Sequence, residues 1–315
     1  MLAASDLTKI AEVCRAIGNE VTDDAGFVPV RRLLSRFHAD LLCRPLLVEG
    51  MLASVPQSAS ASGNGNWVVL VDSETYDISN KDLVEERVTR PLATRLRNTI
   101  AHELVHSLAF RLNEFSINLN VKSDTKQGMQ DLVEGLETET ERLSPLLLFS
   151  DDALKALLRG RKEALSLADL LHVTNNFGIS RYVLVNRLCL VRSVSESADF
   201  LFSTGLRNLA VGIGVWGDSG AQIRGWPLFW NFDNGIVPSF LRRAEGHERL
   251  PAEAVFTDSS FAMLGGPIGS LALEIDAGTR AVPDAKKMKV QIEVEERLRK
   301  SGEEFLFVVR RIAST

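Results

Sequence analysis

The sequence predicts an α+β fold in three parts. A mainly helical domain with a small sheet is expected at residues 1–150, a helix-turn-helix-like helical segment at 151–195, and an α+β domain at 196–315. Apolar residues recur every three or four positions through most of the first two parts, whereas short β-branched runs between glycine-rich turns dominate the third. A chain of 315 residues, 45% of them hydrophobic, can bury a core in each of two or three domains.

The N-terminal domain is expected to begin with two helices. The first is amphipathic. A second is expected over residues 28–52, leading into a short extended piece ahead of a polar loop at 56–66. The β-branched run at 67–73 predicts a strand. One face of the first helix carries Leu7, Ile10, Ala11, Cys14 and Ile17.

Two longer helices are expected to follow this strand. One runs from Thr89, as its N-cap, to about residue 112, and Pro91 suits its first turn. The other covers residues 129–148. Pro145 is expected to disturb this second helix because proline lacks a backbone donor.

Residues 151–192 are expected to be helical with a break at 174–178, after which Ser180 caps the next helix. The segment has the form of a helix-turn-helix, and Arg181 and Arg187 could reach a phosphate backbone. Basic residues are otherwise sparse there, so DNA binding is not expected. The last helix also carries residues typical of packing positions, namely Tyr182, Val183, Val185 and Leu188.

The C-terminal domain is expected to be rich in strands. Its three tryptophans are interpreted as core or turn packing, with a ligand pocket as the alternative; they are Trp216, Trp226 and Trp230. The runs that predict strands, the last two as a hairpin, are 199–204, 209–217, 269–276, 289–297 and 304–312.

Composition restricts the classes of protein. A net charge of −5 and a pI of about 5.7 argue against general nucleic-acid binding. No apolar run is long enough to span a membrane, and no signal peptide is evident. The cysteines are three, widely spaced and without a C-x-x-C pair, which is typical of reduced thiols in a cytoplasmic protein.

Residues 97–112, RNTIAHELVHSLAFRL, hold two of the five histidines. On a helix His102 and His106 lie on one face, which is how a helix supplies two zinc ligands. Glu103, about 100° around the helix, can reach a metal-bound water and act as general base. The alternative is a pair of core histidines hydrogen-bonded to carbonyl groups, with Glu103 in a salt bridge. Burying two imidazoles and a carboxylate in so apolar a helix favours a metal.

A catalytic zinc needs a third protein ligand. Residues 129–149 carry four glutamates, and a helical wheel separates them. Glu139 lies roughly 20° from Leu132 on the apolar face, whereas Glu137 lies roughly 140° away. Glu139 is therefore the predicted third ligand, and Glu137 is the alternative.

The motif RNTIAHELVH at 97–106 resembles the zinc helix of the ImmA/IrrE family of metallopeptidases. ETERLSPLLLFS at 139–150 is similar to the family's second helix, whose ligand glutamate falls on Glu139. PVRRLLSRFHADLLCRPL and WVVLVDS are similar to the family's preceding segments, so the resemblance spans about residues 6–190. It implies a zincin-like peptidase domain with Glu103 as base. It also implies a zinc ion bound by His102, His106 and Glu139.

The resemblance further implies a cytoplasmic regulator of transcription or stress response that cleaves a helix-turn-helix repressor, with a sensory or regulatory C-terminal domain. The chain departs from the family pattern at Asn98, Val105, Thr140, Glu141 and Ser150. These departures motivate an alternative, a non-proteolytic regulatory binding module with a structural or vestigial zinc site. A metal-dependent hydrolase of a small amide or ester fits the same ligands.

Overall fold

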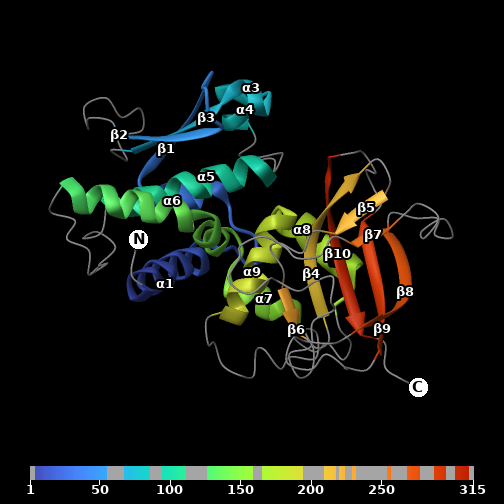
Figure 1. Ribbon diagram of the computed structural model, residues 1–315. Coiled ribbons are helices and arrows are strands. Elements are labelled where there is room, and N and C mark those ends of the chain that lie inside the picture. The colour runs from blue at the N-terminus through green and yellow to red at the C-terminus, as the bar shows by residue number, and fades with distance from the viewer. Residues whose placement is uncertain are drawn as a thin grey trace. The chain divides into compact units, whose positions relative to one another are not determined.

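The fold is mixed α and β, as predicted, and Figure 1 shows it as a computed structural model. Contacts divide the chain into two compact units, Met1–Ala156 with Asn175–Val183, and Leu157–Thr174 with Leu184–Thr315. The segment expected as one piece at 151–195 is therefore shared between the units. The structure describes residues 4–54, 67–85, 94–110, 126–158, 165–193, 209–217, 220–223, 229–231, 254–256, 268–276, 287–295 and 302–311. Within these ranges no helix has the length and apolar character needed to cross a membrane.

The first unit is built around the helix that carries the histidine pair. Its helices are α1 (Ala4–Val21), α2 (Val30–Arg36), α3 (Ser73–Tyr76), α4 (Asn80–Glu85), α5 (Thr94–Ser107), the 3-10 turn η2 (Leu108–Phe110), α6 (Lys126–Leu148) and most of α7 (Asp151–Leu158). Its strands are β1 (Ala39–Arg44), β2 (Gly50–Ser54) and β3 (Trp67–Asp72). In Figure 1, α5 lies between this sheet and α6, and α1 packs against α6.

The three-stranded sheet has the order β1-β3-β2, so β3, the predicted strand, is central. β1 pairs with it in parallel and β2 pairs antiparallel. The helix predicted over 28–52 is wrong beyond Arg36. His38 adopts a left-handed backbone with φ of 43°, and Pro45 restricts Arg44 to extended conformations. Pairing with β3 then outweighs the helical pattern of the leucines.

The core between α1 and α6 confirms most of the predicted faces. Ile10, Cys14 and Ile17 of α1 are buried, and burial raises the pKa of the Cys14 thiol to about 12. Pro145 does not end α6, which continues to Leu148. The buried face of α6 includes Leu132, Leu136, Leu143, Leu146 and Leu147.

Helices α8 (Leu167–Phe177) and α9 (Arg181–Ser193) flank the predicted break. Gly178 has a φ of +56°, and the Ser180 hydroxyl accepts a hydrogen bond from Val183 N at 3.1 Å, which confirms the predicted cap. Arg187 is fully buried, so it does not present a charge on the surface. The packing positions Val183, Val185 and Leu188 are also fully buried.

The second unit contains a seven-stranded sheet of order β7-β5-β4-β10-β9-β8, in which β6 also pairs with β4. The predicted hairpin forms as the antiparallel pair β9–β10, and Trp216 packs in the core 4.8 Å from the Phe305 ring. The strand predicted at 199–204 and Trp226 lie outside the described residues, and Trp230 lies in β6. The predicted start of the histidine helix, Thr89 and Pro91, also lies outside them. Its strands are β4 (Leu209–Gly217), β5 (Gly220–Ile223), β6 (Phe229–Asn231), β7 (Ala254–Phe256), β8 (Ile268–Asp276), β9 (Lys287–Glu295) and β10 (Glu304–Arg311).

Candidate metal centre

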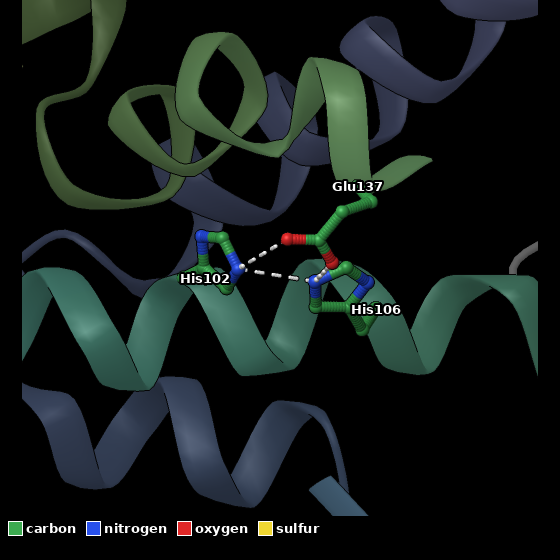
Figure 2. A group of neighbouring side chains, drawn as sticks. All are labelled: His102, His106 and Glu137. Carbon is green, nitrogen blue, oxygen red and sulfur yellow. Dashed lines mark hydrogen bonds and ion pairs between the residues drawn. The ribbon is translucent and has the colours of Figure 1, made fainter. Parts of the chain in front are cut away.

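The histidine pair lies on α5, the helix between the small sheet and α6. Helical spacing places His102 and His106 one above the other, with their Nε2 atoms 3.1 Å apart (Figure 2). Arg97 anchors the helix elsewhere: its side chain is buried, donates a hydrogen bond to Val28 O at 2.8 Å, and lies 4.2 Å from the centre of the Phe27 ring. The core and this arginine together fix which face of α5 carries the imidazoles.

Glu137 of α6 completes a group of three possible ligands. Its Oε2 lies 3.0 Å from His106 Nε2 and its Oε1 lies 3.9 Å from His102 Nε2. Figure 2 shows all three side chains directed toward one another, from two helices. One atom from each of the three residues lies within 4.8 Å of the others, so the group could hold a metal ion.

The spacing of these atoms suits zinc. Zinc–nitrogen bonds of about 2.0–2.1 Å in a tetrahedral site place two nitrogens about 3.3 Å apart. The two Nε2 atoms, 3.1 Å apart, are close to that separation. Two imidazoles and one carboxylate are also a donor set found in catalytic zinc sites, where the fourth position stays open.

Glu139, the predicted ligand, is placed elsewhere on α6. Its carboxylate accepts a hydrogen bond from Arg142 at 2.8 Å, and its side chain is 22% exposed. The structure therefore brings Glu137, the alternative, to the histidines instead of Glu139. The apolar face of α6, on which the helical wheel placed Glu139, packs into the core. The histidines face the groove at the margin of the α5–α6 contact, so a side chain that meets them must lie at that margin too. Glu137 is 66% exposed and meets this condition.

Glu103, the predicted base, is buried between α5 and β2. Burial, first of all, and the nearby charge of Glu137 raise the pKa of the Glu103 carboxyl group. A hydrogen bond from the Leu52 backbone lowers it, and the resulting pKa is about 7. Gly50 allows this approach of β2: a Cβ there would lie 2.5 Å from Thr99 Cγ2 and 3.0 Å from Glu103 Oε1. The sequence gives no sign of this role for Gly50, because the contact joins distant segments.

Burial also sets the charge state of the histidines. It lowers the pKa of His102, against the opposing effect of Glu137 and Glu141. It lowers the pKa of His106 too, assisted by the adjacent His102 and opposed by Glu137. Both shifts favour neutral imidazoles, and only a neutral imidazole has a lone pair for a metal.

The candidate site lies in a groove of about 750 Å³. Its walls come from α5, α6, the edge strand β2 and one end of β3. The groove is lined by Val48, Glu49, Gly50, Met51, Leu52, Ser54, Trp67, Asn98, Thr99, His102, Glu103, His106, Phe110, Val133 and Glu137. All four groups of the candidate site therefore face one space that a ligand can enter.

Comparison with known proteins does not identify this chain: no protein-family model, no curated protein and no solved structure matches it.

Proposed function

We propose that this protein is a zinc-dependent peptidase that hydrolyses a peptide bond in another protein. The observation that carries the proposal is the convergence of His102, His106 and Glu137 in a groove that also holds Glu103. Zinc bound there would polarise a carbonyl group and lower the pKa of a water molecule. His102, His106 and Glu137 would hold the ion, so that two neutral donors and one carboxylate leave it a net positive charge.

Glu103 acts as the general base in this proposal. Its carboxylate lines the groove beside the ligands, and the Leu52 backbone fixes its orientation. It accepts a proton from water as the water oxygen attacks the carbonyl carbon, and the same carboxyl group then protonates the leaving amine. One water is consumed, and the products are a carboxylate and an amine.

A protein substrate is favoured over a small amide or ester. The Glu137 side chain is 66% exposed, so the ligand group opens to solvent along a groove. β2 is an edge strand of its sheet and forms one wall, so an extended substrate can lie beside it. β3, the central strand of that sheet, is flanked on both sides and has no open edge for a substrate.

The resemblance to ImmA/IrrE peptidases suggests a helix-turn-helix repressor as the substrate. The test uses the full chain with zinc, mixed with any small helix-turn-helix protein whose gene is found to adjoin its own. We expect a single cut, visible by mass spectrometry. Glu103→Gln should retain zinc and lose about 10²–10⁴-fold in rate. Undiminished cleavage by this variant would refute Glu103 as the base.

The alternative is a regulatory binding module in which zinc is structural. Its support is the solvent-exposed apolar rim of the groove, because such surfaces mark binding sites. It predicts stoichiometric zinc and stable binding of the repressor with no cleavage over days. The same mixture therefore distinguishes the two functions.

A further inference from the structure

The exposed apolar side chains of the first unit gather at the candidate groove. Among the described residues, the large hydrophobic side chains that are exposed are Leu47, Val48, Met51 and Phe110. Val48, Met51 and Phe110 line the groove, and Leu47 is the chain neighbour of Val48. Large apolar groups held in water at the mouth of a groove are typical of a surface that binds an apolar partner.

Two aromatic rings mark one end of the groove. Phe110 follows His106 by four residues, as His106 follows His102, so it lies about one turn beyond the ligands. The Phe110 ring lies 5.4 Å from that of Trp67, which pairs with Ser54 at the far end of β2. Phe110 is 49% exposed, so half of its surface is free to contact a ligand.

The opposite end of the groove is more polar, although Val48, the chain neighbour of Glu49, is exposed there. Asn98 precedes His102 by four residues, and its buried Oδ1 has no hydrogen-bond partner within the described part of the chain. Glu49 accepts hydrogen bonds from Arg95 and from the Tyr76 hydroxyl, the latter at 3.0 Å. The polarity of the groove therefore changes along α5, from amide and carboxylate groups before the ligands to aromatic rings after them.

We propose that the groove selects an extended peptide that carries a large apolar side chain on one side of the scissile bond. The inference rests on the proposed peptidase function and adds its specificity. The apolar side chain packs against Phe110 and Trp67. The opposite side of the bond faces the polar end and has no apolar requirement.

The test is cleavage of an equimolar library of random twelve-residue peptides by the zinc-loaded full chain. Cleaved bonds are identified by mass spectrometry. We expect Phe, Leu, Met and Trp to be enriched at one position adjacent to the cleaved bond and not at the position across it. Phe110→Ala should lower kcat/KM for the best peptide by about 10–200-fold, the range that apolar pockets achieve. It should change kcat/KM for the analogue with alanine at that position by less than about threefold.

Leu47→Ala is the matched control, because Leu47 is exposed and apolar but does not line the groove. It should leave the preference unchanged. The zinc-loaded Glu103→Gln variant is tested in parallel for binding of the same library. Cleavage without apolar preference, or a preference that survives Phe110→Ala, overturns the inference and leaves the peptidase function standing. Apolar selection in binding by Glu103→Gln, with no cleavage by the wild type, supports the specificity and refutes the peptidase function.

Discussion

Buried carboxylates in the two units have opposite surroundings. In the second unit, Glu293 of β9 is buried, accepts a hydrogen bond from Leu167 N at 2.8 Å and forms an ion pair with Arg310. In the first unit, Glu103 is buried beside the Glu137 carboxylate, and the hydrogen bond from Leu52 offsets only part of the cost. One carboxylate faces a cation of its own chain and the other faces a second carboxylate.

This difference distinguishes a carboxylate that stabilises the fold from one that is suited to metal binding and catalysis. A buried charge with a full set of partners holds elements together, and here it joins the start of α8 to the large sheet. Among the described residues, no lysine or arginine pairs with the two imidazoles and two carboxylates of this group. Such a group is stable only at a cost, which a bound cation removes. The comparison predicts that changes to the group around Glu103 act mainly on metal and activity, whereas loss of the Glu293 pair acts on stability.

The largest expected effect is on zinc binding. His106→Ala should abolish it, because one of the two neutral donors is lost. Glu137→Gln should weaken it by more than the 10- to 100-fold typical of residues that only support a ligand. Glu139→Gln, two positions away on the same helix, should leave the affinity unchanged. Competition with a chromogenic chelator measures all three. Weakening by Glu139→Gln and not by Glu137→Gln would restore the prediction made from the helical wheel.

The next effect tests the paired carboxylate of the second unit. Glu293→Ala should lower the free energy of unfolding by about 3 kcal/mol, because Arg310 then loses its partner. Glu304→Ala, at an exposed position of the neighbouring strand, should change it by less than about 0.5 kcal/mol. Urea denaturation measures both variants, and zinc affinity should be the same in both. Equal stability of the two variants would contradict the structural role of the pair.

A smaller effect on stability and activity is expected at Gly50, where β2 packs against Glu103. Gly50→Ala places a methyl group against Thr99 and Glu103, so β2 must shift. Overpacking of this kind costs about 1–3 kcal/mol. Ser54→Ala, exposed on the same strand, should leave the thermal stability unchanged. Thermal unfolding and kcat measured together check this, because a displaced Glu103 should lower kcat while zinc content stays constant. Unchanged kcat would mean that β2 does not position the base.

The smallest effect is a pH dependence at the end of β3. Asp72 caps α3 and accepts hydrogen bonds from Thr75 and from Leu46 N, which lower its pKa to about 2. A lowered pKa means that the contribution to stability is complete above about pH 4 and is lost as the pH falls toward 2. Asp72→Asn should abolish this part of the acid dependence of the unfolding midpoint. An identical acid profile in the wild type and the variant would exclude Asp72 as its source.

The sequence was most informative where function depends on local spacing. His102, Glu103 and His106 share one helix, so the pattern alone places them on adjacent faces. The choice between Glu137 and Glu139 depends on how α6 crosses α5, which no single-helix pattern contains. β1 was missed for a similar reason, because its leucines suit a helix until β3 offers hydrogen bonds. Predictions of α1, β3, β4 and the β9–β10 hairpin were confirmed because their apolar patterns are long and regular.

The buried Arg97 has a consequence for how the site can change. A helix that rolls about its axis by one residue turns its side chains by about 100°, which would carry both imidazoles away from Glu137. The guanidinium prevents that roll, because it is clamped by Phe27 and Val28 in the connection between α1 and α2. The orientation of the two imidazoles thus depends on a short segment distant from them in sequence, and substitutions at Phe27 or Val28 can disturb the candidate centre indirectly.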